Sequence, residues 1–312
     1  MGRILVTGAT GFIGKTLVKA FEEKEMLYRA AMRSNDKSIC YQESVITGTL
    51  TADQDWTDAL DGIDIVIHLA GKVPRKGCSL LTYIEQNTTA TINLARQAEA
   101  ANVKRFIFIS SIKLNGDKTG QDQQFTEMVE NIPKDPYALS KFKAEKGLIN
   151  ISKTGNMEIV IIRPPVVYGP GVKGNFSTMI RWLRLGVPLP FSQISNRRSF
   201  IAIDNLVDFI CMCIQHPRAA NQIFLISDGE CISTTTLLER ISRALSLKSR
   251  LVAVPPLLLR RIILFIGSEQ LVDSLLSSLE LDISKAINIL GWKPIISMEE
   301  QIKKMRLEDE AN

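Results

Sequence analysis

The sequence is poor in the residues that build metal sites and disulfide frameworks. It has only two histidines among 312 residues, His68 and His216, and its five cysteines form no Cys-x-x-Cys pair. A structural zinc site needs about four closely spaced nitrogen or sulfur ligands, and scattered cysteines in odd number are typical of a protein kept reduced. These shortages predict a protein without a metal centre and with a cytoplasmic location.

The sequence also lacks a block of charge, a leader segment and a membrane-spanning run. Its net charge of +5 comes from 38 basic and 33 acidic residues with no basic run, which disfavours a nucleic-acid partner and leaves weak attraction for an anionic small molecule. The chain opens directly on a strand-like segment rather than a signal peptide. Its most apolar segment, Leu251–Ile266, is interrupted by prolines and arginines. That segment predicts a buried helix, with a helix lying on a membrane surface as the alternative.

Short apolar runs alternate with amphipathic stretches of helix length through the first half of the chain. This alternation predicts an α/β fold with a doubly wound, parallel Rossmann sheet, and a change of rhythm after Arg163 predicts a smaller mixed α/β lobe that binds substrate. The expected domains are a dinucleotide-binding domain over 1–165, with part of 200–226 returning to it, and a substrate-binding lobe mainly over 166–199 and 227–312. The expected strands are Arg3–Thr7, Tyr28–Met32, Asp64–Ala70, Arg105–Ser110, Glu158–Arg163 and Gln222–Ile226, and the expected helices are Ile13–Lys24, Ser79–Ala101 and Pro136–Lys153.

Three glycines connect the first expected strand to the first expected helix. Gly8, Gly11 and Gly14 lie in the run Thr-Gly-Ala-Thr-Gly-Phe-Ile-Gly. Glycines allow a sharp turn and a close approach to a pyrophosphate, and the helix that follows offers its free N–H groups to the phosphates. The turn, together with Phe12 and Ile13, therefore predicts a dinucleotide-binding site.

The end of the second expected strand usually indicates which dinucleotide is bound, because an acidic residue there holds the ribose 2′-hydroxyl. Here the strand is followed by Arg33, and the first acid, Asp36, lies slightly too far along unless a loop brings it back. An arginine at this place can pair with a 2′-phosphate. The sequence therefore favours NADP(H), with NAD(H) as the alternative.

A tyrosine and a lysine four residues apart follow a helix-start signal. Asp135 can cap the helix and Pro136 suits its first turn, so Tyr137 and Lys141 would lie on one helix face. An adjacent ammonium group lowers the pKa of a phenol, which suits proton transfer. Ser111, at the end of an earlier strand, can hydrogen-bond a substrate oxygen. Each feature alone is weak, but the glycine turn, the serine and the Tyr-x-x-x-Lys pair stand in a productive order.

With these motifs the sequence resembles extended short-chain dehydrogenase/reductases of the NAD-dependent epimerase/dehydratase family, close to the UDP-glucose 4-epimerase group. The resemblance runs nearly end to end and includes Val66–Ala70, Asn87, Arg163–Gly171 and Leu290–Pro294. It implies an enzyme, a UDP-sugar substrate and a homodimer formed through the helices Ser79–Ala101 and Pro136–Lys153.

The resemblance also implies roles for individual residues. Ser111, Tyr137 and Lys141 match the catalytic positions of the family, and Arg197 is a rival to Arg198 as a phosphate contact. The implied cofactor-binding residues are Gly8, Gly11, Phe12, Ile13, Gly14, Arg33, Leu69, Ala70, Tyr137, Lys141 and Pro164, and the implied substrate-binding residues are Ser111, Lys113, Asn175 and Arg198.

Two enzymatic interpretations remain open. The run from Ser110 to Gly116 looks like a subgroup linked to bacterial surface polysaccharides, whose members include 4-epimerases and 4-keto reductases of the UDP-2-acetamido-2,6-dideoxy-hexulose type. Thr49 replaces an adenine-binding Asp found in many relatives. Loss of acids on the adenosine side argues against an epimerase that retains NAD, so a 4-keto reductase is favoured. The alternatives are a UDP-glucose or UDP-N-acetylglucosamine 4-epimerase and, more remotely, a non-catalytic dinucleotide-binding protein.

Overall fold

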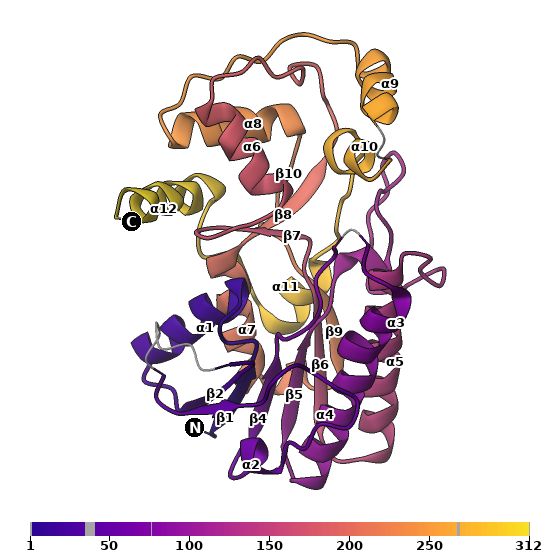
Figure 1. The fold of residues 1–312 in the computed structure, drawn as a ribbon, viewed down its shortest axis with the longest axis vertical. Helices are drawn as coiled ribbons and strands as arrows, with labels where there is room; N and C mark the ends of the chain where they lie inside the picture. Colours follow the sequence, from indigo (N-terminus) through magenta and orange to yellow (C-terminus); the bar gives the residue numbers. More distant parts are fainter. Residues whose placement is uncertain (1, 35–40, 76, 267–268, 312) are drawn as a thin grey trace.

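The computed structural model describes residues 2–34, 41–75, 77–266 and 269–311. Its larger part is a seven-stranded sheet in the order β3-β2-β1-β4-β5-β6-β9, in which every neighbouring pair is parallel (Figure 1). The order reverses between β1 and β4, which is where ligands bind in doubly wound sheets. The predicted fold class is confirmed. The strands are β1 (Ile4–Thr7), β2 (Tyr28–Met32), β3 (Ser44–Ile46), β4 (Ile65–His68), β5 (Arg105–Ile109), β6 (Glu158–Arg163) and β9 (Gln222–Leu225).

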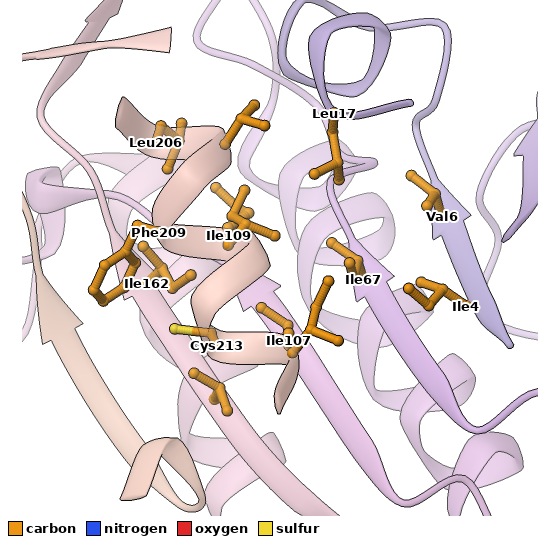
Figure 2. Packing of buried hydrophobic residues seen from close by; sticks show 14 of the residues in the cluster. Ile4, Val6, Leu17, Ile67, Ile107, Ile109, Ile162, Leu206, Phe209 and Cys213 are labelled. Atoms are coloured by element: carbon orange, nitrogen blue, oxygen red, sulfur yellow. The ribbon is translucent and has the colours of Figure 1, made fainter. Parts of the chain in front are cut away.

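Helices cover both faces of this sheet, because the strand side chains alternate between two apolar cores. Val6 belongs to one core and its neighbour Leu5 to the other. Figure 2 shows the first core, in which Phe209 and Cys213 lie against the isoleucines of β5 and β6. The helices are α1 (Phe12–Glu23), α7 (Ile203–Gln215) and α11 (Ser284–Leu290) over the first core and α2 (Thr57–Leu60), α4 (Ala90–Ala100) and α5 (Pro136–Thr154) over the second.

The smaller lobe is a mixed sheet surrounded by helices, as predicted. Its strand order is β10-β8-β7, with β7 and β8 parallel and β8 and β10 antiparallel. The division of the chain near residues 165 and 227 stays a prediction, and within the second segment α11 packs against the large sheet rather than the lobe. The elements of the lobe are β7 (Val166–Tyr168), α6 (Asn175–Arg184), β8 (Arg198–Ala202), β10 (Cys231–Ile232), α8 (Thr234–Ala244), α9 (Pro256–Ile266), α10 (Glu269–Leu276) and α12 (Met298–Ala311).

The predicted helix Ser79–Ala101 is not regular. It consists of α3 (Leu80–Tyr83), a π-helical turn η1 (Ile84–Thr89) and α4. Ser79 caps its start by accepting a hydrogen bond from the Thr82 N–H at 3.1 Å. π-Helical turns commonly occur at functional sites. This one carries the buried Asn87 toward the end of α5 where Tyr137 lies.

The prediction of a buried helix within Leu251–Ile266 is wrong. The helix exists as α9, but only Leu259 and Ile263 are buried among the α9 side chains that the structure describes. The reason is geometric: α9 is apolar nearly all round, and a helix that packs on a protein along one stripe buries only that stripe. No helix in the described ranges is both long and apolar enough to cross a bilayer.

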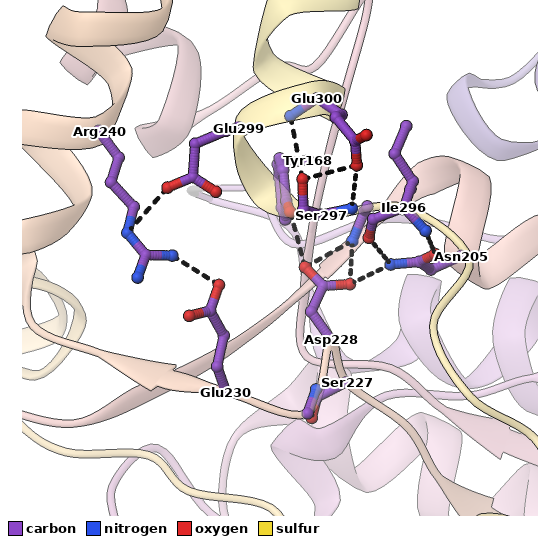
Figure 3. Close-up of polar contacts among 12 residues, drawn as sticks. Tyr168, Asn205, Ser227, Asp228, Glu230, Arg240, Ile296, Ser297, Glu299 and Glu300 are labelled. Atoms are coloured by element: carbon purple, nitrogen blue, oxygen red, sulfur yellow. Dashed lines mark hydrogen bonds and ion pairs between the residues drawn. The ribbon is translucent and has the colours of Figure 1, made fainter.

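A partly buried carboxylate ties the lobe to the sheet (Figure 3). Asp228 accepts hydrogen bonds from the Tyr168 hydroxyl at 2.6 Å and from the Asn205 amide at 2.7 Å. Asn205 also holds the backbone of Ile296, just before α12. Burial raises the pKa of Asp228, and these donors oppose the shift. Elements from β7, α7 and the chain before α12 are thereby fixed to one another.

Candidate active site

The glycine turn lies at the reversal point of the sheet and is packed without room for side chains. Gly8 has a φ of +73°, and a Cβ there would approach the Ala70 nitrogen to 2.8 Å. Gly14 packs directly over the backbone of Gly8 and Ala9. Gly11 is the N-cap of α1, and no side chain caps the helix start or places an acid in its first turn. The first N–H groups of α1, among them those of Phe12 and Ile13, are thus not capped by a side chain.

A directed hydrogen-bond chain runs beneath this turn, and sequence reasoning did not assign it a role. Thr91 donates its hydroxyl proton to the Asn87 carbonyl at 2.8 Å, so the His68 Nε2, 2.9 Å from that hydroxyl, is the donor of the pair. The His68 Nδ1 then accepts from the Thr7 hydroxyl at 2.7 Å, which in turn accepts from the Ala70 N–H at 3.3 Å. Burial lowers the pKa of His68 to about 3, so the ring stays neutral. The chain fixes the backbone that follows β4.

The strand ends and Asn87 explain how this hydrogen-bond chain is assembled. Thr7 and His68 are the last residues of neighbouring strands, and they are paired in register. Asn87 continues the chain, since its amide group bonds the backbone of Lys72 at 2.6 and 3.0 Å and the Ser140 hydroxyl at 3.1 Å. These contacts join the glycine side of the site to the first turn of α5.

Tyr137 and Ser111 lie together at the carboxyl end of β5, as predicted. Asp135 caps α5 by accepting from the Ala138 N–H at 2.8 Å, and Tyr137 follows in the first turn. Burial raises the pKa of Tyr137 to about 12, while hydrogen bonding with the Ser111 side chain acts in the opposite direction. The Tyr83 ring packs edge-on against the Tyr137 ring at 6.0 Å. The phenol therefore carries its proton at neutral pH unless a nearby charge favours the phenolate.

Lys141 lies one helical turn further along α5. Its Nζ donates to the Ile109 carbonyl at 2.9 Å and lies 4.4 Å from the centre of the Phe108 ring. Burial lowers the pKa of Lys141 to about 8, and Glu145, one further turn along, opposes this shift. The Nζ also borders Gly71, where a Cβ would come within 3.6 Å of it. The Lys141 ammonium is thus placed at the ends of β4 and β5.

Glu145 is in turn held by a buried ion pair that sequence reasoning missed. Arg163 at the end of β6 donates to both Glu145 oxygens, at 2.9 and 2.6 Å, and the two side chains are each 3% exposed. Arg163 also donates to the Glu127 carbonyl at 2.9 Å. Pro164 follows directly and is buried, with its carbonyl accepting from the Ile112 N–H at 3.1 Å. The same strand end therefore supports both α5 and the segment after Ser111.

The predicted substrate residues occupy the rim where the small lobe meets the sheet, and they are not gathered around one point. Lys113 pairs with Asp117 at 3.0 Å. Asn175, exposed at the start of α6, lies 3.4 Å from the Ser274 hydroxyl of α10. Arg198 is buried and donates to the carbonyls of Asp273 and Ser277 at 2.7 and 2.8 Å. Both Asn175 and Arg198 thus contact α10.

Arg197 and Arg198, the two candidates for a phosphate contact, have different hydrogen-bond partners. Arg197 is mostly exposed and donates to Glu280 at 2.9 Å. Burial lowers the pKa of Arg198 to about 10. Its hydrogen bonds to Asp273 and Ser277 go to carbonyl oxygens, and the nearby charges of Asp273 and Asp117 oppose the shift of its pKa.

Arg33 is exposed immediately after β2, at the edge where an adenosine ribose is bound in such sheets. Asp36, the acid considered for the NAD(H) alternative, lies outside the described residues. Within the described ranges no three His, Cys, Asp or Glu side chains gather as a metal site.

Comparison with known proteins identifies the family. The profile of the NAD dependent epimerase/dehydratase family matches residues 4–227. The chain belongs to this family. The UDP-glucose 4-epimerase of Vibrio cholerae is 40% identical to it over 309 residues, covering 96% of this chain and 93% of that protein. The predicted resemblance and the predicted enzymatic nature are both confirmed.

Other similar proteins are more distant. The N-acetyl-alpha-D-glucosaminyl-diphospho-ditrans,octacis-undecaprenol 4-epimerase of Escherichia coli O157:H7 is 26% identical over 255 residues, covering 78% of this chain and 73% of that protein. The crystal structure of UDP-N-acetylglucosamine 4-epimerase from Bacillus cereus matches with a TM-score of 0.81 at 20% identity, covering 99% of each chain. At that identity the structural match supports the fold alone.

Proposed function

We propose that this protein is a nucleotide-sugar 4-epimerase that inverts C4 of a UDP-hexose and keeps its nicotinamide dinucleotide through the reaction. The observation that carries the proposal is the near full-length similarity, at 40% identity, to a protein named UDP-glucose 4-epimerase. The sequence analysis favoured a 4-keto reductase and held the epimerase as the alternative. The similarity to the Vibrio cholerae protein favours the epimerase over the reductase, because it covers 96% of this chain.

The residues present fit a nicotinamide dinucleotide. Gly8, Gly11 and Gly14 form a turn that excludes side chains, and the uncapped start of α1 supplies N–H donors for a pyrophosphate. The ends of β4 and β6, with Leu69, Ala70 and Pro164, border the same end of the sheet. When bound there, the dinucleotide supplies the hydride acceptor and donor for C4.

Tyr137, Ser111 and Lys141 perform the proton chemistry at the C4 oxygen in this proposal. Ser111 hydrogen-bonds the oxygen and holds it near the phenol. The Lys141 ammonium stabilises the phenolate of Tyr137, which lets Tyr137 take the proton from a C4 hydroxyl and return it to a C4 carbonyl oxygen. Burial raises the pKa of Tyr137 to about 12 and lowers the pKa of Lys141 to about 8, because it disfavours the charged form of each group. Perturbed pKa values of this kind are common at catalytic sites.

The rim residues would hold the nucleotide diphosphate. Arg198 is suited to a phosphate because its partners are carbonyls rather than a carboxylate, and Asn175 and Lys113 lie on the same rim. Arg197, paired with Glu280, is the weaker candidate. Hydrogen bonds from charged donors to phosphate contribute to binding in both epimers, because the diphosphate does not change in the reaction.

A 4-keto reductase is the second candidate, and Arg33 is the observation that favours it. An exposed arginine at the end of β2 suits the 2′-phosphate of NADP(H), which a reductase draws from solution and releases after each turnover. The preference for NADP(H) over NAD(H) that Arg33 suggested is part of this reductase candidate. Under the epimerase proposal Arg33 contacts solvent or the ribose, and the protein retains NAD(H).

A cofactor and substrate survey separates the two candidates. The purified protein is denatured and its released nucleotide identified, and a panel of UDP-hexoses and 4-keto-UDP-sugars is assayed with no addition, with NADH and with NADPH. The epimerase proposal predicts bound NAD and conversion of a UDP-hexose without any addition. Oxidation of NADPH that depends on a 4-keto-sugar, with no conversion in its absence, would establish the reductase instead.

We also propose a homodimer through the outer faces of α3, α4 and α5. Leu81 on α3 is 80% exposed although it is a large apolar residue. Sedimentation equilibrium of the wild type and of Leu81→Asp tests the contact. A dimer that dissociates in the variant supports it, and a wild-type monomer rules it out.

A further inference from the structure

The α9 helix presents apolar side chains to solvent on nearly every side. Phe265 is 94% exposed and Leu257 is 78% exposed, and both lie opposite the buried stripe of Leu259 and Ile263. In Figure 1 α9 stands at the end of the small lobe that is farthest from the large sheet. A helix with this pattern needs a second apolar environment besides its own protein. The other exposed apolar residues of α9 are Leu258, Ile262 and Leu264.

The charged residues of α9 and of the chain segment before it are all basic. Between residues 241 and 266 the chain has five basic residues and no acidic one, so this segment alone carries the +5 that the whole chain carries. All five of these side chains are exposed. The first acid after them is Glu269, at the start of α10. The basic residues are Arg243, Lys248, Arg250, Arg260 and Arg261.

The apolar surface extends beyond the helix. The backbone of Leu189 pairs with that of Leu251, which places the end of the α6 segment beside the strand-like run before α9. Exposed apolar residues lie on both sides of this pairing: Leu185 and Val187 on one side, Val252 on the other. Figure 1 shows the run before α9 crossing the same outer end of the lobe.

We propose that α9 and the basic run before it form a docking surface for an anionic lipid bilayer. An 11-residue helix is about 16 Å long, which is too short to span a bilayer and suits a helix that lies in the plane of the headgroups. Leucine, isoleucine and phenylalanine then enter the acyl boundary. Arg260 and Arg261 reach the phosphates with their charged ends while their aliphatic stems stay in the apolar layer.

A second copy of this chain fits the same face poorly. A symmetric contact through α9 would bring Arg260 and Arg261 of one copy against those of the other, and like charges in the centre of an interface oppose association. Anionic lipid headgroups supply the opposite charge without that conflict. The charge distribution therefore selects a lipid surface over self-association.

Docking through α9 would also bear on the active site. The next helix, α10, provides the carbonyls of Asp273 and Ser277 that hold Arg198, and its Ser274 contacts Asn175. A bilayer bound to α9 would thus lie against the pair of helices that borders the substrate rim. The docking surface itself does not depend on which sugar nucleotide is the substrate.

Vesicle co-sedimentation tests the docking surface without any activity measurement. The full-length protein is mixed with sucrose-loaded vesicles of phosphatidylcholine alone or of phosphatidylcholine with phosphatidylglycerol, at low and at high salt. The proposal predicts pelleting with the anionic vesicles only, weakened by salt. Arg260→Gln/Arg261→Gln should lower the partition coefficient about thirtyfold, the equivalent of about 1 kcal/mol for each arginine.

The apolar contribution is tested by Leu257→Gln/Phe265→Gln, which should lower the partition coefficient at least tenfold. Leu27→Gln is the matched control, because Leu27 is also a large exposed residue, at 60%, and lies at the other end of the molecule before β2. Circular dichroism checks that each variant is folded. Equal binding by all variants, equal binding to both vesicle types, or a wild type that never pellets overturns the proposal. If Leu257→Gln/Phe265→Gln instead dissociates an oligomer in the absence of lipid, the face is a contact between copies and the proposal is wrong.

Discussion

The strand ends of the sheet lobe and the α9 end of the small lobe differ in how their side chains are partnered. In the sheet lobe, several polar side chains at the strand ends are buried and hydrogen-bonded, as with Arg163 on Glu145 and His68 between Thr7 and Thr91. In the small lobe, α9 leaves large apolar side chains in solvent. Buried polar groups need partners to offset their desolvation, which makes the sheet lobe rigid where chemistry is expected. The outer end of the small lobe is built as a surface for contact.

Two buried arginines make the same contrast at the level of single residues. Arg163 donates to both oxygens of a carboxylate, whereas Arg198 donates to two carbonyl oxygens. The charge of Arg163 is neutralised inside the protein. Arg198 interacts with the carboxylates of Asp273 and Asp117 through charge alone, so its own charge is less fully compensated than that of Arg163. We expect the first to act on stability and the second on substrate affinity.

The largest expected effect is on the chemistry of the sheet lobe. Tyr137→Phe should lower kcat about 10²–10⁴-fold, because it removes the group proposed to move the proton at the C4 oxygen. The release of bound dinucleotide on denaturation should be unchanged. Tyr83→Phe is the control, since it keeps the ring that packs on Tyr137. Full activity in Tyr137→Phe would show that another residue moves the proton.

Breaking the buried ion pair should have the largest effect on stability. Glu145→Gln leaves the Arg163 charge without its carboxylate, which costs about 3–5 kcal/mol of unfolding free energy for a buried pair. Asp204→Asn removes one partner of the more exposed pair with Lys304 and should cost less than about 1 kcal/mol. Urea denaturation measures both. Similar losses in the two variants would mean that burial does not distinguish them.

Removing Arg198 should act on binding rather than on the chemical step. Arg198→Met should raise KM about 10–100-fold with little change in kcat, because a hydrogen bond to a charged group is worth about 1.5–3 kcal/mol. Arg197→Met, which loses an exposed pair with Glu280, should change KM only slightly. If Arg197→Met has the larger effect, the assignment of the two neighbours is reversed.

The last expected effect is a gradual pH dependence of stability in the sheet lobe. His68 has a pKa near 3 in the folded protein, against an unfolded value of 6.5, so the unfolded chain binds the extra proton between these values. Unfolding free energy should therefore fall as the pH drops from 6.5 toward 3, by up to about 1.4 kcal/mol per pH unit from this residue. His68→Gln should flatten the slope in this window, and His216→Gln should leave it as in the wild type. An unchanged slope in His68→Gln would assign the acid sensitivity to other groups.

The sequence predicts the sheet lobe well because its signals are local. Tyr28–Met32 and Glu158–Arg163 are strands with the predicted bounds, and Ser111 and Tyr137 meet at the end of β5. The roles given to the site residues stay predictions. The sequence does not reveal features that depend on contacts between distant segments. These are the ion-pair partner of Arg163, the hydrogen-bond chain that links Ala70 to Asn87, and the carbonyls that accept from Arg198. The exposure of α9 was missed because apolar composition cannot distinguish a buried helix from one that meets a lipid surface.

Label retention at C4 is the most direct test of the proposed epimerisation. The purified protein is incubated, without added nicotinamide, with a UDP-hexose that carries deuterium at C4, and the product is analysed by NMR and mass spectrometry. The account predicts the C4 epimer with the deuterium still at C4, because the hydrogen leaves and returns within one active site. Absence of the epimer, or a product formed only with added NADPH that carries the cofactor's hydrogen at C4, would contradict the account.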